Sequence, residues 1–111
     1  MLLTRGDVFE VPGPRRPVGH EQRGPRLGVV VQSDDLPLST VLLAPTSRSA
    51  PPRFFRPLVH VAGEATCVLV EQLRTIDVSR LGRLVGHLDR DDRGAVDDAL
   101  ELVLALDLRT R

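Results

Sequence analysis

The chain has 111 residues, enough for one modest hydrophobic core, so we expect a single domain that spans residues 1–111. Its 15 basic residues, all of them arginine, balance 15 acidic residues, which argues against a uniformly basic protein. The chain has no run of about 18 apolar residues, and this excludes a transmembrane helix. The first residues lack the pattern of a secretory signal, so we expect a cytoplasmic protein with no membrane association.

Strand patterns begin near the N-terminus. The alternation of polar and apolar residues at Asp7–Val11 predicts a half-buried strand, and the apolar run Leu27–Val31 predicts a central one. Between them, the segment Pro12–Pro25 contains four Pro and three Gly and almost no apolar side chains, so it is predicted to be a long surface loop. Thr40–Ala44 predicts a third strand, which Pro45 is expected to end.

The strand patterns continue to about residue 88. Leu58–Val61 and Cys67–Val70 predict two strands on either side of a turn at Gly63. Asp77 is expected to cap a short helical turn, and Leu84–Leu88 predicts the last short strand.

The pattern changes to a helical period at the C-terminal end. Asp89 is a suitable N-cap, and apolar residues then recur at helical spacing through about Leu106. The last turns are apolar on nearly every side, so we expect part of that surface to lie in a dimer interface. Six or seven short strands followed by one helix predict a β-rich α+β fold, a small SH3-like and partly open barrel with a C-terminal α-helix.

The balanced net charge hides an asymmetry along the chain. Residues 1–60 hold eight Arg against five acidic residues, whereas residues 61–111 hold seven Arg against ten. The excess is concentrated in Pro12–Arg26 and Pro45–Pro57, each with a net charge of +3. A GC-rich genome is the plain explanation for arginine without lysine, but planar guanidinium groups also suit phosphate recognition.

Two polar segments stand where loops meet predicted strands. Glu21–Arg26 runs into the second strand, and Pro45–Ser49 follows the third, so we expect the two loops to face one substrate.

Neither a nucleophile elbow nor the phosphate-binding Gly-Lys signature is present. Arginine, hydroxyl and carboxylate groups suit a phosphodiester and its more highly charged transition state, which we expect Arg26 to stabilise. In RNA the neighbouring 2′-OH can be the nucleophile, so this chemistry needs no metal.

The remaining reactive residues predict little further chemistry. The lone Cys67 excludes an internal disulfide and has no nearby base, while His60 and His87 are read as strand residues. The histidines show no metal-ligand spacing, so we expect no metal and no cofactor. His20 differs because it adjoins Glu21–Arg26, which makes it a candidate for proton transfer or phosphate contact.

Four motifs in the order Arg5–Phe9, Glu21–Arg26, Ala44–Ser47 and Val70–Asp77 resemble those of the MazF/PemK toxins of bacterial toxin-antitoxin systems. The resemblance covers nearly the whole chain. It implies a homodimeric SH3-like barrel of the MazF/CcdB type. It also implies a metal-independent endoribonuclease that cuts single-stranded RNA at short motifs and leaves 2′,3′-cyclic phosphate and 5′-OH ends.

The resemblance also implies roles for individual residues. Arg26 matches the family's catalytic Arg and Thr46 its catalytic Thr, although Leu27 follows Arg26 where the family generally has Pro, and this bears on how Arg26 is aimed. The expected partner is a cognate antitoxin with an acidic, partly disordered tail that lies in the groove between protomers. The residues expected to bind RNA are Glu21, Gln22, Arg23, Ser47, Arg48, Arg53 and Gln72.

Two other functions are compatible with the same sequence. One is a non-catalytic toxin of this barrel class that binds and poisons a protein target such as DNA gyrase. The other is a small regulatory or RNA-binding barrel without chemistry, in which Phe54 and Phe55 would form a patch for base stacking.

Overall fold

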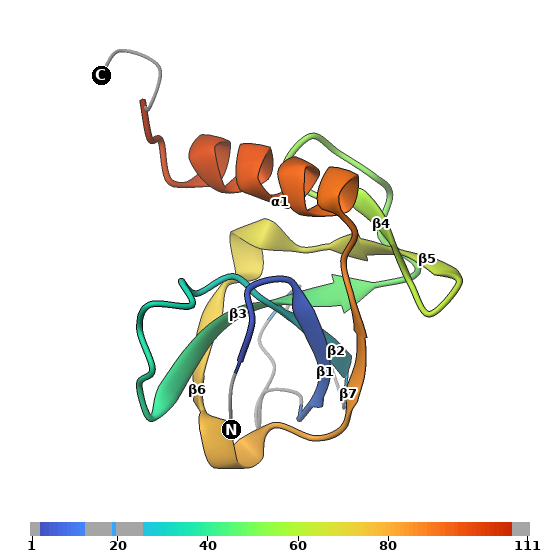
Figure 1. The fold of residues 1–111 in the computed structure, drawn as a ribbon. Coiled ribbons are helices and arrows are strands. Elements are labelled where there is room, and N and C mark those ends of the chain that lie inside the picture. The colour runs from blue at the N-terminus through green and yellow to red at the C-terminus, as the bar shows by residue number, and fades with distance from the viewer. Residues whose placement is uncertain (1–2, 13–18, 20–25, 108–111) are drawn as a thin grey trace.

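The computed structural model describes residues 3–12, 19 and 26–107. Within these residues it contains seven β-strands, two short 3₁₀ helices (η1 and η2) and one α-helix (Figure 1). The elements are β1 (Asp7–Val11), β2 (Arg26–Val30), β3 (Thr40–Ser47), β4 (Leu58–Val61), β5 (Glu64–Val68), η1 (Val70–Gln72), β6 (Arg74–Asp77), η2 (Val78–Arg80), β7 (Leu84–His87) and α1 (Arg90–Val103).

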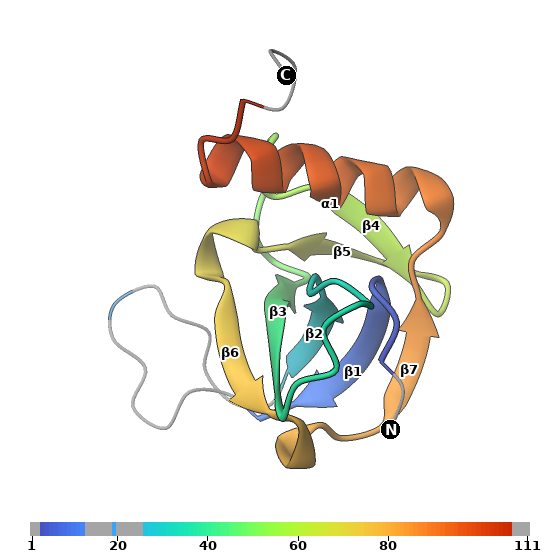
Figure 2. The ribbon, with the colours of Figure 1, turned by 60° about the vertical axis from the view of Figure 1, so that its left-hand side comes forward.

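The strands form one antiparallel sheet that curls into a nearly closed barrel. The strand order is β4-β5-β3-β2-β1-β7, and β6 also pairs with β3. β3 is therefore the central strand, because it pairs with β2, β5 and β6. α1 lies across the part of the barrel formed by β4 and β5 (Figures 1 and 2). This architecture confirms the predicted β-rich α+β barrel with a C-terminal helix, and no helix among the described residues is long and apolar enough to cross a membrane.

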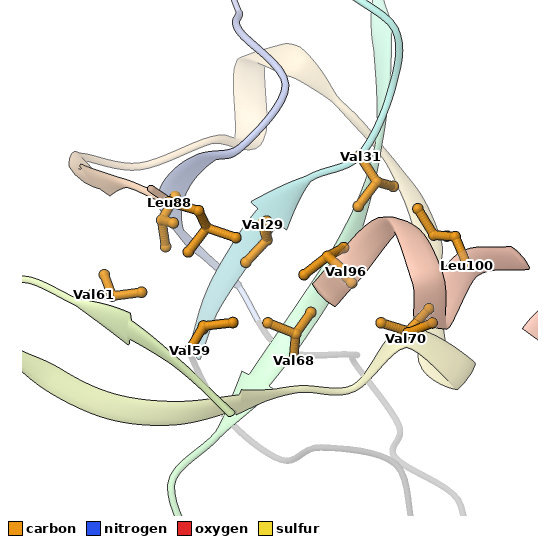
Figure 3. Packing of buried hydrophobic residues seen from close by; sticks show 12 residues of the cluster. Val29, Val31, Val59, Val61, Val68, Val70, Leu88, Val96 and Leu100 are labelled. Atoms are coloured by element: carbon orange, nitrogen blue, oxygen red, sulfur yellow. The ribbon is translucent and has the colours of Figure 1, made fainter. Parts of the chain in front are cut away.

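The alternation along the central strands separates the buried apolar residues into two clusters. The larger cluster packs beneath α1 and includes Val8, Val29, Val68 and Val96, all at most 3% exposed (Figure 3). The second cluster takes the alternate residues of the same strands, such as Phe9, Val30 and Leu43. Full burial of each such side chain contributes about 1.5–3 kcal/mol, so both faces of β1, β2 and β3 hold the fold together.

The structure corrects the predicted end of the third strand. β3 does not stop before Pro45 but continues through it to Ser47. Pro45 lies opposite Gly28 of β2 on one edge of β3, and on the other edge its carbonyl accepts a hydrogen bond from the Leu69 N–H at 2.8 Å. It is tolerated because this second edge changes partner there, from β6, which pairs as far as Leu43, to β5. From Thr46 onward β3 pairs with β5.

The fifth predicted strand is shifted towards the N-terminus. β5 begins at Glu64 and ends at Val68, whereas Val70 belongs to η1. The turn before β5 uses left-handed backbone at Ala62 (φ 51°) and Gly63 (φ 83°), which matches the twist of a two-residue hairpin. The short helical turn capped by Asp77 is confirmed, since its side chain accepts a hydrogen bond from the Ser79 N–H at 2.9 Å.

The start of α1 agrees with the sequence, and its end comes slightly earlier than predicted. The Asp89 carboxylate accepts a hydrogen bond from the Asp92 N–H at 2.8 Å, as an N-cap should. The helix ends at Val103, and Ala105 then takes a left-handed conformation with φ 54°. The leucines at positions 102, 104 and 106 are about half exposed.

Removal of the N-cap should measurably weaken the fold. We expect Asp89→Ala to lower the free energy of unfolding by about 0.5–2 kcal/mol, because the first turn of α1 loses a hydrogen-bond acceptor. Asp98→Ala is the matched control, since Asp98 is exposed in the middle of the same helix and should change stability by less than about 0.5 kcal/mol. Urea denaturation measures both, and equal stabilities for the two variants would rule out the capping role.

Candidate active site

A cleft of about 620 Å³ opens where the larger core cluster ends. Its volume lies within the range of about 300–1,000 Å³ that is usual for ligand sites. In a strand, residues two positions apart lie on the same face. In four strands, a residue of the larger core cluster and a residue lining the cleft are two positions apart, so the cleft and the core lie on the same face of these strands. The corresponding core and cleft residues are Val8 and Glu10 in β1, Val29 and Leu27 in β2, Ala44 and Thr46 in β3, and Val68 and Thr66 in β5.

Arg26 and Thr46 both line this cleft. Arg26 is the first residue of β2, opposite Val11 of β1, and is exposed. Thr46 lies near the end of β3, opposite Val68 of β5, and is only 4% exposed. The structure thus places an exposed guanidinium-bearing residue and a nearly buried hydroxyl residue, from two antiparallel neighbouring strands, in one cavity.

Ser47 and Arg48 follow Thr46 and line the same cleft. The Ser47 hydroxyl accepts hydrogen bonds from the N–H groups of Ser49 at 3.3 Å and Ala50 at 3.1 Å, which hold the start of the following loop. The Arg48 side chain is 73% exposed and forms an ion pair with Glu64 of β5. The Ser47 hydroxyl therefore stabilises the loop through these hydrogen bonds, while the Arg48 side chain is accessible to a ligand.

The other residues expected to bind RNA fall into two groups. Arg53 and Gln72 are described by the structure but do not line the cleft: Arg53 is exposed in the loop between β3 and β4, and Gln72 ends η1. The remaining residues lie outside the described part of the chain. They are His20, Glu21, Gln22 and Arg23.

The cleft also contains residues outside the set predicted from the sequence. Arg83 precedes β7, and its carbonyl accepts a hydrogen bond from the Glu10 N–H at 2.9 Å, so its backbone is fixed to β1. In the sequence, Arg83 precedes the predicted strand Leu84–Leu88 just as Arg26 precedes the predicted strand Leu27–Val31, and this similarity is a signal by which Arg83 can be found. Thr66 of β5 could be found only from the strand register, because nothing in its sequence neighbours marks it.

The charges of the cleft favour an anionic ligand. Among the residues that the structure describes, three arginines (Arg26, Arg48 and Arg83) and two glutamates (Glu10 and Glu64) line it. Each glutamate lies against an exposed arginine, with Glu10 Oε1 3.7 Å from Arg83 Nε and Glu64 paired with Arg48. Exposed ion pairs of this kind contribute about 0–1 kcal/mol, so a bound phosphate can replace the carboxylates at low cost.

An ion pair holds the loop that follows β3. Arg56 Nε donates a hydrogen bond to Glu71 Oε2 at 2.7 Å, and this joins the end of the loop to η1.

Burial raises the pKa of the nearby Cys67 thiol, although the positive charge of Arg56 opposes the shift. The thiolate is therefore disfavoured, which agrees with the expectation that Cys67 is not a nucleophile.

The structure confirms the prediction that two histidines are strand residues. His60 lies in β4 and His87 ends β7, where its Nδ1 is 2.8 Å from Asp7 Oδ1. The contact between Asp7 and His87 links β1 to β7. Asp7 also accepts a hydrogen bond from the Thr4 N–H at 2.9 Å. Within the residues that the structure describes, no three His, Cys, Asp or Glu side chains gather as a metal-binding group.

Comparison with known proteins gives close relatives in sequence. The family model described as PemK-like, MazF-like toxin of type II toxin-antitoxin system matches residues 4–104. A protein of Mycobacterium tuberculosis described as a candidate toxin, Rv3098A, is 42% identical over 106 residues, which cover 95% of this chain and 100% of the relative. Endoribonuclease EndoA of Bacillus subtilis is 32% identical over 120 residues, covering 96% of this chain and 97% of EndoA.

Solved structures share the fold at lower sequence identity. MazF from Deinococcus radiodurans superposes with a TM-score of 0.79 at 20% identity and covers 96% of this chain and 99% of its own. An endoribonuclease in complex with its cognate antitoxin, from a mycobacterial species, gives a TM-score of 0.76 at 15% identity, with 95% and 97% covered. The family match, the curated relatives and the barrel agree, so the chain belongs to the PemK-like and MazF-like toxins of type II toxin-antitoxin systems.

Proposed function

We propose that this member of the toxin family is a metal-independent, sequence-specific endoribonuclease that cleaves single-stranded RNA. The observation that carries the proposal is the cleft that contains both Arg26 and Thr46, where arginines outnumber glutamates among the described lining residues. The similarity to EndoA, which is named as an endoribonuclease, supports the same activity. RNA fits the site because its own 2′-OH supplies the nucleophile. The cleft then needs only to bind the RNA and to stabilise the negative charge that grows on the phosphate.

In this reaction the 2′-oxygen of one nucleotide forms a bond to the adjacent phosphorus, and the bond from phosphorus to the 5′-oxygen of the next nucleotide breaks. The products are a 2′,3′-cyclic phosphate and a 5′-OH. Negative charge grows on the phosphate oxygens in the transition state, and the Arg26 guanidinium stabilises it by charge-assisted hydrogen bonds. The Thr46 hydroxyl, which β3 places in the same cleft, binds the same phosphate.

Two proton transfers complete the reaction, because the 2′-OH loses a proton and the leaving 5′-oxygen gains one. Arg26 is the proposed donor to the leaving oxygen, and His20 or Glu21, both outside the described residues, is the proposed acceptor from the 2′-OH. Further RNA contacts are proposed for Gln22, Arg23, Ser47, Arg48, Arg53 and Gln72.

The proposal extends to the assembly. Leu102, Leu104 and Leu106 are each about half exposed at and beyond the end of α1, and we expect a second copy of the chain to cover part of this apolar area in a homodimer. The natural inhibitor is then a cognate antitoxin whose acidic, partly disordered tail competes with RNA for the arginines. A structural neighbour bound to its cognate antitoxin supports this expectation. The toxin would act in the cytoplasm, where its RNA substrate is found.

The test is direct cleavage of RNA by the purified protein. A single-stranded RNA pool of mixed sequence is incubated with the protein in EDTA, and the fragment ends are identified. We expect cuts at one short motif that leave 2′,3′-cyclic phosphate and 5′-OH ends. If the pool stays intact while the protein binds a gyrase fragment tightly, the chain is instead a non-catalytic toxin that acts on a protein target.

A further inference from the structure

Thr66 carries a buried hydroxyl group that the fold does not use. The residue is 4% exposed, and among the described residues its Oγ1 has no hydrogen-bond partner. It lies opposite Val59 in the pairing of β4 with β5, and Val59 is completely buried in the larger core cluster. A buried hydroxyl without a partner costs folding free energy, and a valine has nearly the same shape and favours strands equally. Stability alone therefore does not explain a hydroxyl at this position.

The position of Thr66 relates it to the proposed reaction centre. It lines the same cleft as Arg26 and Thr46. β3 and β5 pair with Thr46 opposite Val68, so Thr66 is the diagonal neighbour of Thr46 on the same face of the sheet. Diagonal neighbours in an antiparallel pair are roughly 7–8 Å apart. If a ligand binds Thr46 through a phosphate, the part of the ligand adjoining that phosphate therefore lies close to Thr66.

The surroundings of Thr66 suit a nucleobase better than a second phosphate. Val61 of β4 and Val85 of β7 line the cleft on its side, and Leu27 adds a third apolar side chain. Aliphatic side chains pack against the flat face of a base, while a hydroxyl can donate to or accept from the base edge. A cleft of about 620 Å³ also exceeds what one phosphate fills.

We propose that Thr66, Val61 and Val85 form a subsite for the nucleotide next to the scissile phosphate, with the Thr66 hydroxyl contributing to the choice of base. This inference rests on the RNA cleavage proposed above. In the structure Oγ1 is shielded from solvent, but threonine in a strand has more than one accessible χ1 rotamer. One rotation about the Cα–Cβ bond exchanges the hydroxyl with the methyl group of the same side chain and lets it reach a bound base.

The test compares Thr66→Val with Thr66→Ser. Both variants and the wild type are given a library of RNA substrates, and the relative kcat/KM is measured for every base at each position around the cut. We expect Thr66→Val to lose about tenfold in kcat/KM on the preferred motif, the size of one hydrogen bond, and to discriminate less at one position next to the cut. Thr66→Ser should keep both the rate and the preference.

Thermal unfolding supplies the second readout, and Thr75→Val is the control. Thr75 is an exposed threonine in β6 that does not line the cleft. We expect Thr66→Val to unfold at the same temperature as the wild type or higher, because an unsatisfied buried hydroxyl has been removed. Thr75→Val should leave the rate and the base preference unchanged.

Three results would overturn the subsite. The first is a Thr66→Val variant with the rate and base preference of the wild type, and this leaves the proposed function intact. The second is a Thr66→Val variant whose activity falls only in step with a lower unfolding temperature, since the hydroxyl would then be structural. The third is a wild-type protein that cuts no member of the library, and this would remove the proposed function together with the subsite.

Discussion

Replacement of Arg26 by alanine is expected to reduce the rate of RNA cleavage by about 100- to 1,000-fold, the usual effect of removing one donor that stabilises transition-state charge. Arg26 is exposed at the first position of β2 and belongs to no core cluster, so the variant should fold normally. Single-turnover cleavage of one labelled RNA measures the rate, and circular dichroism checks the fold.

Two further variants show which property of Arg26 matters. Arg26→Lys keeps the positive charge but loses the planar fork of donors, so we expect it to recover only a small part of the activity. Arg80→Ala removes an exposed arginine in η2, outside the cleft, and should cleave at the wild-type rate. Wild-type activity in Arg26→Ala, or an equal loss in Arg80→Ala, would show that Arg26 has no special place in the reaction.

Replacement of Thr46 by valine is the second large expected effect, with a loss of about 100-fold in kcat if the hydroxyl binds the phosphate in the transition state. Valine keeps the β-branched shape that this nearly buried position of β3 requires. Thr46→Ser should retain most of the activity. Thr40→Val is the control, because Thr40 starts the same strand but does not line the cleft.

The double variant tests whether Arg26 and Thr46 act on the same phosphate. Residues that act as one unit give strongly non-additive losses, so Arg26→Ala combined with Thr46→Val should be little slower than the slower single variant. Losses that multiply would mean that the two residues serve independent steps. The single-turnover rate of the double variant decides between these outcomes.

Most of the fold could be predicted because the local signals agree with the packing. The alternating residues of Asp7–Val11 and Leu58–Val61 are strands with the predicted bounds, and Asp89 caps the helix as expected. The predicted strand end at Pro45 is wrong, because a proline usually ends a strand and here it does not. A backbone N–H is not needed where one edge of β3 passes from β6 to β5, and that change of partner is a property of the tertiary structure.

The site was predictable only where the chain order itself brings residues together. Arg26 and Thr46 stand at adjacent ends of two strands that follow each other and pair, so their approach follows from a simple antiparallel connection. Thr66 and Arg83 reach the same cleft through the pairing of β5 with β3 and the closure of β7 onto β1. Neither pairing can be deduced from the neighbours of these residues in the sequence.

The most direct test of the central claim is to map RNA ends in cells that express either the wild-type chain or Arg26→Ala. The claim is that the cleft containing Arg26 and Thr46 cuts RNA. It predicts new 5′-OH ends at one short motif after induction of the wild type, and none after induction of Arg26→Ala at the same protein level. The same new ends in both strains, or no new ends with the wild type, would contradict it.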